Sequence, residues 1–212
     1  MQIILPCLNE AAALPWVLER IPPGVGAIVV DNGSDDGSAE LARAGGATVV
    51  LADRPGYGSA CHTGLEAATA DLVAVCDCDA TIDPADAVRL AAVLTEVDLA
   101  VARRRPTDRA SWPLPQRVAN RELARRLRQR TGYPIDDVGP LRVARRKALL
   151  ELGIQDRRSG YPVETLLRAH TAGWTIRQVD VTYRPRAGAS KVTGTWRGSL
   201  QAYRDMSRLL AA

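Results

Sequence analysis

Residues 72–79 of the chain read Leu-Val-Ala-Val-Cys-Asp-Cys-Asp, an apolar run of five followed at once by an acidic pair. A short and continuously apolar run predicts a strand buried on both faces, as the strands of a parallel sheet are. Asp77 and Asp79 then leave that strand at its carboxyl end. Similar apolar runs earlier in the chain predict three more strands, at residues 2–5, 27–30 and 48–51.

Helical patterns separate these strands. Apolar and small residues recur at helical spacing over residues 14–21, 38–44 and 59–70. Strand and helix therefore alternate through the first half of the chain, which predicts an α/β fold with a mostly parallel central sheet flanked by helices. In a sheet of this kind, ligands bind at the carboxyl ends of the strands.

The second half of the chain is less regular. The predicted helices run from Pro84 to about Glu96 and over residues 115–130, 163–172 and 196–210. The predicted strands are 98–102 and 175–183, and polar loops are expected over 103–113 and 184–195. Because no internal repeat or linker interrupts the chain, we expect a single domain over residues 1–212.

Charge and composition narrow the kinds of protein that this chain can be. The net charge is +4, and the second half is rich in arginine, which suits an anionic ligand or an anionic membrane surface. Arginine content alone does not indicate nucleic-acid binding, so we expect no nucleic-acid partner. The four cysteines form no zinc motif, and neither a signal-peptide pattern nor an apolar run of 18 residues occurs. These features predict a cytoplasmic protein with reduced thiols.

Polar clusters follow all four strands predicted in the first half. Because the carboxyl ends of parallel strands meet at one edge of a sheet, these clusters bring many carboxylates together, and carboxylates repel unless a cation or hydrogen-bond donors neutralise them. Asp77 and Asp79 suit a hard divalent cation, since Mg²⁺ takes one or two carboxylates together with substrate phosphates. Ordinary turns and helix caps are the alternative interpretation. The clusters are residues 6–10, 31–38, 53–58 and 77–79.

Two common phosphate-binding motifs are absent. The turn Gly56-Tyr57-Gly58 precedes a helix whose N-terminus can approach a phosphate, but it lacks the pattern G-x-G-x-x-G and follows the third strand rather than the first. A dinucleotide-binding fold is therefore a poor interpretation. The P-loop pattern G-x-x-x-x-G-K-[ST] does not occur in the sequence.

Taken in order, the motifs of this chain resemble glycosyltransferase family 2, which has the GT-A fold. The resemblance is greatest to the bacterial branch related to polyprenyl- and dolichyl-phosphate sugar synthases, and it extends along nearly the whole chain. The motifs that carry it are Pro6-x-x-Asn9-Glu10, Val30-Asp31-Asn32-Gly33-Ser34-x-Asp36-Gly37-Ser38, Gly56-Tyr57-Gly58-x-Ala60, Asp77-x-Asp79, Asp137-Val138-Gly139-Pro140-Leu141-Arg142, Gly160-Tyr161-Pro162-Val163-Glu164 and Tyr183-Arg184-x-Arg186-x-Gly188-x-Ser190-Lys191-Val192-x-Gly194-Thr195.

The resemblance implies a role for each matching residue, with the nucleotide in the half 1–103 and the acceptor in the half 104–212. Asp77 and Asp79 would hold Mg²⁺ or Mn²⁺. Asp137, with its neighbour Asp136, stands where the family has its general base or an acceptor-site carboxylate. The donor nucleotide would contact Pro6, Leu8, Asn9, Glu10, Asp31, Asn32, Gly58, Asp77 and Cys78. The acceptor would contact Arg142, Glu164, Arg184, Arg186 and Lys191.

The activity implied by this resemblance is an inverting transfer of one sugar from a UDP- or GDP-sugar. The Q-x-x-R-W signature of processive synthases is missing, and Asn32 replaces the second aspartate of the family's Asp-Asp-Gly-Ser motif. A polyprenyl-phosphate acceptor is already anionic and needs no base, whereas a hydroxyl acceptor needs Asp137. The amphipathic helix over 196–210 is expected to touch the inner face of a membrane peripherally.

Two other functions stay open as alternatives. A sugar-phosphate nucleotidyltransferase has a similar fold, but its usual Gly-rich, basic loop after the first strand is missing between Pro6 and Glu10. A non-catalytic nucleotide-sugar-binding protein would have no need of the intact carboxylates. The sequence does not predict which sugar or base is bound, or the oligomeric state.

Overall fold

The computed structural model describes residues 1–188 and 196–210. The strands are β1 (Gln2–Cys7), β2 (Gly26–Asp31), β3 (Thr48–Leu51), β4 (Leu72–Cys76), β5 (Leu99–Pro106), β6 (Leu141–Arg145) and β7 (Ile176–Tyr183). The helices are α1 (Leu14–Glu19), α2 (Ser38–Ala44), α3 (Tyr57–Ala67), α4 (Asp86–Ala92), α5 (Leu114–Thr131), α6 (Arg146–Glu151), α7 (Tyr161–Thr171) and α8 (Trp196–Leu209). A short 3-10 turn, η1 (Val93–Thr95), follows α4 directly.

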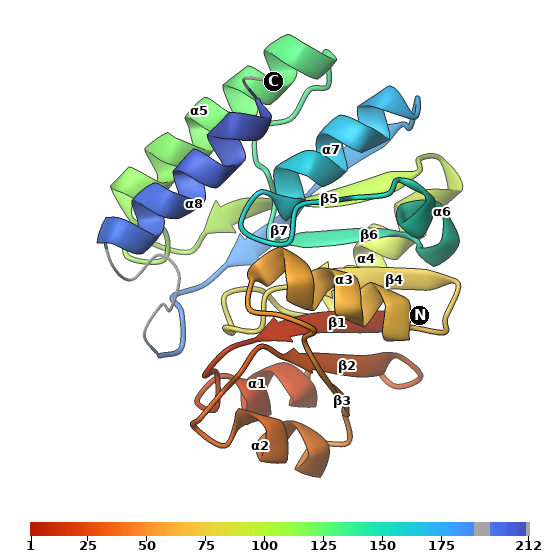
Figure 1. Ribbon diagram of the computed structural model, residues 1–212, viewed down its shortest axis with the longest axis vertical. Coiled ribbons are helices and arrows are strands. Elements are labelled where there is room, and N and C mark those ends of the chain that lie inside the picture. The colour runs from red at the N-terminus through yellow and green to blue at the C-terminus, as the bar shows by residue number, and fades with distance from the viewer. Residues whose placement is uncertain (189–195, 211–212) are drawn as a thin grey trace.

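The strands of the described chain form one sheet in the order β3-β2-β1-β4-β6-β5-β7 (Figure 1). The pairs β1/β2, β1/β4, β2/β3 and β5/β7 are parallel, and β6 runs antiparallel to its neighbours β4 and β5. This confirms the prediction of a mostly parallel α/β sheet. Because β2, β1 and β4 are adjacent and parallel, the polar clusters that follow them lie at the same edge of the sheet.

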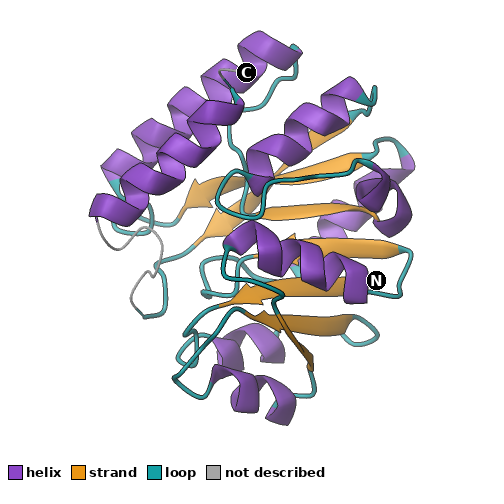
Figure 2. Ribbon diagram, viewed as in Figure 1, coloured by secondary structure: helices purple, strands orange, loops and turns teal. Residues whose placement is uncertain are grey.

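Helices cover both faces of the sheet (Figure 2). One face carries α3, α5, α6, α7 and α8 around a core that includes Ile4, Val30 and Leu127. The other carries α1, α2 and α4 around a core that includes Ile3 and Val29. Since successive residues of a strand point to opposite faces, Ile3 and Ile4 enter different cores. The central strands are therefore buried on both sides, which explains their continuously apolar sequence.

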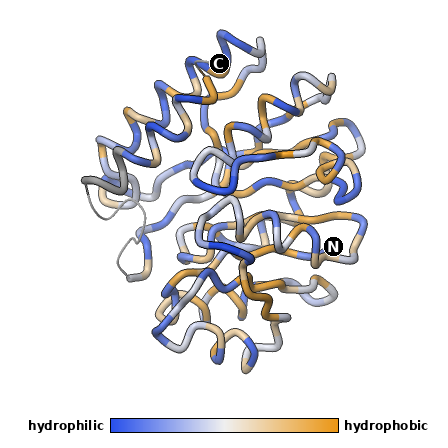
Figure 3. The backbone as a smooth tube through the Cα atoms, viewed as in Figure 1, coloured by the Kyte–Doolittle hydropathy of each residue, from blue (hydrophilic) through white to orange (hydrophobic). Residues whose placement is uncertain are grey.

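The hydropathy of the chain follows this layering (Figure 3). The tube is mostly hydrophobic along the central strands and changes colour along α5, which has only one buried side. On α5, Leu123 and Leu127 are buried, as predicted, while Arg121 and Arg125 are exposed. The spacing of four residues between the two leucines places both on the helix face that packs against the domain.

The structure corrects two predictions for the second half. Residues 103–113 are predicted to form a loop, but β5 continues to Pro106, which pairs with Tyr183 of β7. Backbone pairing with β7 keeps residues 103–106 in a strand. Their arginine side chains are too polar for an apolar sequence pattern to predict that strand. The segment Leu141–Arg145 and the following α6 have no predicted counterpart, because two arginines interrupt an otherwise apolar strand.

The C-terminal helix α8 is amphipathic, as predicted, and its apolar side packs against the domain. Ala202 and Leu210 are buried, and Tyr203, Met206 and Leu209 pack against the core beneath α5 and α7 (Figure 1). Internal packing therefore accounts for the amphipathic pattern, and the peripheral membrane contact stays a prediction. Within the described residues, no helix is both long and apolar enough to cross a bilayer.

Two glycines with the same backbone conformation allow a test of how tightly the sheet edge is packed. Gly139 (φ +77°) and Gly132 (φ +72°) both lie in the left-handed region. A Cβ added to Gly139 would stand 2.6 Å from the carbonyl oxygen of Ala102. A Cβ added to Gly132 would meet nothing within 4 Å. We expect Gly132→Ala to cost about 1–2 kcal/mol of unfolding free energy and Gly139→Ala about 1–3 kcal/mol more, because of the added overpacking. Urea denaturation of both variants measures the difference, and equal losses would contradict the close approach.

Candidate active site

The loops after β1 and β2 hold each other at one rim of the sheet. The backbone N–H of Asn9 donates to the Ser34 hydroxyl (2.9 Å), and that of Glu10 donates to the Ser38 hydroxyl (2.9 Å). The Asp31 carboxylate accepts from the Ser34 N–H at 3.0 Å. Asn9 itself has φ +56°, a left-handed conformation that asparagine tolerates better than most residues. The rim is therefore shaped by the chain's own hydrogen bonds before any ligand binds.

The predicted donor residues of the first two loops lie at this rim. Cys7 pairs in register with Asp31, and its thiol is hydrogen-bonded to that of Cys78, which lowers the pKa of Cys7 although burial opposes the shift. The ends of β2, β1 and β4 are thus linked side by side. Pro6 is the last but one residue of β1, and Leu8 follows the strand, both half-buried. Contacts of these residues with a nucleotide stay predictions.

Asn32, which follows β2, and Tyr57, the first residue of α3, connect the loop after β3 to the rim. The Asn32 side-chain oxygen accepts from the Gly56 N–H (3.1 Å), and the Tyr57 hydroxyl donates to the Asp77 carboxylate (3.0 Å). Gly58 does not need a ligand to explain its lack of a side chain: a Cβ there would stand 2.8 Å from backbone atoms of the 156–158 loop. Its nucleoside contact stays a prediction.

Asp77 and Asp79 follow β4 at the rim. Burial raises the pKa of Asp77 to about 6, and the neighbouring charge of Asp79 adds to the effect, while Arg142 opposes it. One oxygen of Asp79 accepts from the Thr81 N–H (3.1 Å) and from the Thr81 hydroxyl (2.6 Å). A raised pKa means that the protein makes the ionised form of Asp77 unfavourable, which a bound cation would reverse.

The donor set at the rim fits a divalent cation that brings other ligands with it. No group of three or more His, Cys, Asp or Glu residues in the described chain is arranged to hold a metal ion by itself. Mg²⁺ is typically bound by one or two carboxylates together with substrate phosphates and water. Asp77 and Asp79 provide such a pair of carboxylates, so the rim suits a metal shared with a phosphorylated ligand.

An arginine from the C-terminal segment contacts two of the rim carboxylates. The Arg186 guanidinium donates to Asp79 (2.8 Å) and to Glu10. The resemblance implies that Arg186 contacts the acceptor, and in the structure its guanidinium lies against residues that are predicted to bind the metal and the donor. Arg184 is exposed, with its guanidinium 5.5 Å from the centre of the Trp16 ring. Lys191 lies outside the described residues.

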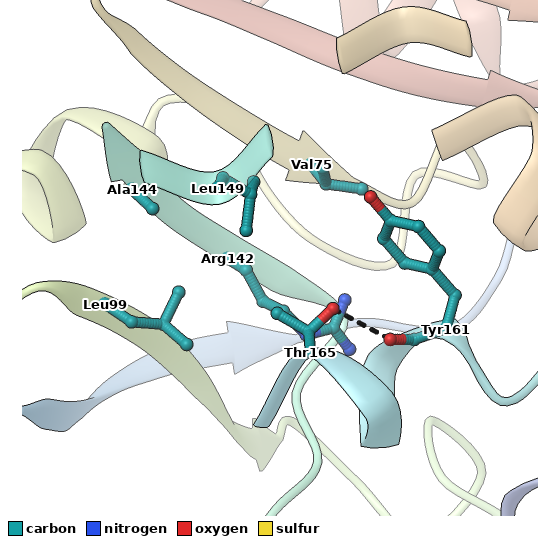
Figure 4. A pocket seen from close by; sticks show the side chains of 7 residues that line it. All are labelled: Val75, Leu99, Arg142, Ala144, Leu149, Tyr161 and Thr165. Atoms are coloured by element: carbon teal, nitrogen blue, oxygen red, sulfur yellow. Dashed lines mark hydrogen bonds between the residues drawn. The ribbon is translucent and has the colours of Figure 1, made fainter. Parts of the chain in front are cut away.

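Arg142 and Glu164 are buried rather than exposed to an acceptor. Arg142 donates to the carbonyl oxygens of Val138 and Gly139, and its Nε and Nη1 have no partner within the described residues. Figure 4 shows its side chain in a small cavity of about 10 Å³ next to Thr165, with room for about one water molecule. Glu164 accepts from the Gln155 and Asp156 N–H groups and from Arg168. The predicted acceptor contacts of both residues would require this packing to open.

The predicted base Asp137 is bound tightly by an arginine that the sequence analysis missed. Arg104 donates to Asp137 through its backbone N–H (2.8 Å), Nε (2.9 Å) and Nη2 (2.5 Å), and it stacks on the Trp112 ring. Burial opposes the charge of Asp137, but Arg104 and the Gly139 N–H prevail and lower its pKa. A carboxylate with a lowered pKa is a weak proton acceptor. The sequence signal for Arg104 is strand alternation: if β5 continues past the buried Ala102, the side chain two residues later points to the same buried face.

Asp136 has a different environment from its neighbour. Its side chain is more than half exposed, and it accepts from Arg103 (3.1 Å) and Arg128 (3.0 Å). The two adjacent carboxylates therefore have different partners. Their predicted catalytic roles stay untested, and the geometry assigns Asp137 a structural role beside the rim.

The fold and the rim together define a class of protein. A mostly parallel sheet covered by helices on both faces, with carboxylates after its first, second and fourth strands, is the GT-A architecture of glycosyltransferases. The chain belongs to glycosyl transferase family 2, whose profile matches residues 2–153. It is a glycosyltransferase.

Known relatives agree with this assignment. An uncharacterized glycosyltransferase of Mycobacterium tuberculosis is 49% identical and covers 99% of this chain and 97% of its own length. The dolichyl-phosphate hexose transferase of Haloferax volcanii is 29% identical over 91% of this chain and 86% of its own. Among solved structures, glucosyl-3-phosphoglycerate synthase of M. tuberculosis in complex with Mn²⁺, UDP and glucosyl-3-phosphoglycerate aligns with a TM-score of 0.75 and 25% identity, over 99% of this chain and 78% of that one.

Replacing Asp137 tests its structural role against its neighbour. We expect Asp137→Asn to lower the unfolding free energy by about 3–5 kcal/mol, because Arg104 is left buried and unpaired, and Asp136→Asn to lower it by less than about 1 kcal/mol. Since folding lowers the pKa of Asp137, its contribution is complete above the ordinary pKa near 4 and is lost as the pH falls below it. Denaturant titrations at pH 7 and pH 3 measure both effects, and similar losses for the two variants would refute the difference.

Proposed function

We propose that this glycosyltransferase transfers one sugar from a UDP- or GDP-sugar to a phosphate-bearing acceptor, with Mg²⁺ or Mn²⁺ bound at the rim. The observation that carries the proposal is the gathering of Glu10, Asp77 and Asp79 at one edge of the sheet. A nucleoside diphosphate would add further negative charge there. A divalent cation between the carboxylates and the diphosphate removes that repulsion.

The residues of the rim divide the work of such a transfer. Asp31 and Asn9 would contact the nucleoside, and Asp77 and Asp79 would hold the metal. The metal would stabilise the diphosphate as it leaves. The acceptor oxygen would then attack the anomeric carbon from the opposite side, which inverts the configuration. We infer a single transfer per donor, since the sequence lacks the signature of processive synthases.

Relatives of known activity support a phosphate-bearing acceptor. One relative is named for dolichyl phosphate, and the undecaprenyl-phosphate 4-deoxy-4-formamido-L-arabinose transferase of Aeromonas hydrophila is 27% identical over 77% of this chain. The solved synthase is in complex with Mn²⁺, UDP and glucosyl-3-phosphoglycerate. Both lipid phosphates and phosphorylated metabolites thus occur among proteins similar to this chain.

The state of Asp137 favours a lipid phosphate over a hydroxyl acceptor. A hydroxyl needs a base to take its proton, and the predicted base is buried and paired with Arg104. A phosphate oxygen is already anionic and attacks without one. We therefore propose a polyprenyl phosphate as the acceptor.

The two halves of the chain share one sheet, and we propose that they act as one domain with the donor on residues 1–103 and the acceptor on 104–212.

Because the apolar side of α8 is covered, a peripheral membrane contact of this helix would use its exposed arginines Arg204 and Arg208. Such a contact is electrostatic and depends on anionic lipids.

Substituting Asp79 tests the metal role. Asp79→Ala should reduce metal-dependent release of UDP or GDP from the donor by at least about 100-fold, because the metal that stabilises the leaving diphosphate is no longer held. Asp71→Ala is the matched control, since Asp71 is exposed and precedes β4, at the end of that strand opposite to Asp77 and Asp79. Release of nucleoside diphosphate in the presence of Mn²⁺ is the measurement, and undiminished turnover by a folded Asp79→Ala protein would exclude the metal role.

The acceptor is identified by where a labelled sugar goes. With UDP-[¹⁴C]glucose or GDP-[¹⁴C]mannose, undecaprenyl phosphate and Mn²⁺, label should move into the organic phase, whereas 3-phosphoglycerate should accept none. Label in a water-soluble product instead would make a phosphorylated metabolite the acceptor. Release of pyrophosphate from a nucleoside triphosphate and a sugar phosphate would indicate a nucleotidyltransferase, and binding without any product would indicate a non-catalytic binder.

A further inference from the structure

Arg186 lies between two carboxylates that the proposed reaction needs for its donor and metal. Its Nη1 donates to Oδ2 of Asp79 at 2.8 Å, and its Nη2 donates to Glu10. The side chains of all three residues are mostly buried, with 24% of Arg186, 12% of Asp79 and 10% of Glu10 exposed. A single guanidinium therefore neutralises two carboxylates, in the loops that follow β1 and β4.

The backbone fixes Arg186 in this position. The Ala187 N–H donates to the Asp79 carbonyl oxygen (3.1 Å), and the Arg184 N–H donates to the Thr81 carbonyl oxygen (2.8 Å). Residues 184–187 are thus attached along the loop that carries Asp79. These backbone hydrogen bonds hold the Arg186 side chain next to Asp79 and Glu10.

The contacts of Asp79 leave one oxygen for a cation, and Arg186 occupies it. Oδ1 of Asp79 accepts both hydrogen bonds from Thr81, whereas Oδ2 accepts from Arg186. A metal bound to Oδ2 would lie next to the guanidinium, and two cations at such a distance repel each other strongly in a mostly buried site. Metal and arginine therefore compete for the same oxygen.

We propose that Arg186 is a positioning residue that occupies the cation position of the donor-free enzyme and leaves it when metal and nucleotide bind together. This inference rests on the proposed metal-dependent function. A free divalent ion would have to displace a tethered charge while gaining only two carboxylates. An ion that arrives with a diphosphate gains the phosphate oxygens as well, so it can displace the guanidinium. The contact thus makes metal binding depend on the nucleotide.

The test measures Mn²⁺ binding directly, by the loss of the electron paramagnetic resonance signal of free Mn²⁺, without and with saturating UDP or GDP. In the unaltered protein, nucleotide should tighten Mn²⁺ binding strongly. In Arg186→Gln, Mn²⁺ without nucleotide should bind at least about tenfold more tightly, because the competing charge is gone, and nucleotide should tighten it correspondingly less. Arg186→Lys keeps a charge at this position and should behave more like the unaltered protein.

Arg184→Gln is the matched control. It removes the same charge two residues away, from a side chain that lies near Trp16, and should change the affinity for Mn²⁺ by less than about twofold because an exposed charge is screened. Circular dichroism confirms that each variant is folded.

The outcomes separate the two proposals. If nucleotide supports Mn²⁺ binding in every protein but Arg186→Gln binds free Mn²⁺ no more tightly than the unaltered protein, the competition is refuted and the metal site stands. An equal gain in Arg184→Gln would also refute it, since a general change in charge would then suffice. If no protein binds Mn²⁺ even with UDP or GDP, the metal-dependent function fails and the competition with it.

Discussion

Carboxylates crowd one edge of the sheet, and the site is arranged around their neutralisation. Parallel strands β1, β2 and β4 end side by side, so the acidic residues that follow them cannot avoid one another. Burial and the charge of Asp79 raise the pKa of Asp77 to about 6, which reflects this crowding. Arg186 and Arg142 both reduce the repulsion among these carboxylates, Arg186 by direct contact with Asp79 and Glu10 and Arg142 through its charge near Asp77.

Two arginine–carboxylate pairs near the rim serve different ends. Arg104 binds Asp137 through three donors, stacks on an aromatic ring and lies beside a carboxylate that is only 2% exposed. Breaking that pair would leave a buried charge, so it acts as a permanent part of the fold. Arg186 instead divides its guanidinium between two carboxylates and keeps part of its side chain in solvent. A cation of higher charge can replace such a contact without opening the core.

The resemblance found in the sequence groups residues that the structure places in different surroundings. The resemblance implies acceptor contacts for Arg142, Glu164 and Arg186 alike. In the structure, Arg186 contacts Glu10, 176 positions earlier, and Glu164 fixes the backbone of residues 155 and 156. Arg104 was overlooked because three consecutive arginines suggest a solvated loop, and only pairing with β7 makes them part of a strand.

The sequence by itself determined the alternation of strand and helix, the parallel sheet and the acidic residues at the strand ends. The strands and helices follow from local apolar patterns in the sequence. The common position of the acidic residues follows from the rule that the carboxyl ends of parallel strands meet at one edge of a sheet. Only the tertiary structure decided which arginine meets which carboxylate, and whether a carboxylate is buried or exposed. Asp136 and Asp137 show the reason: they are neighbours in sequence, but burial and partners depend on segments far away in the chain, which no local pattern records.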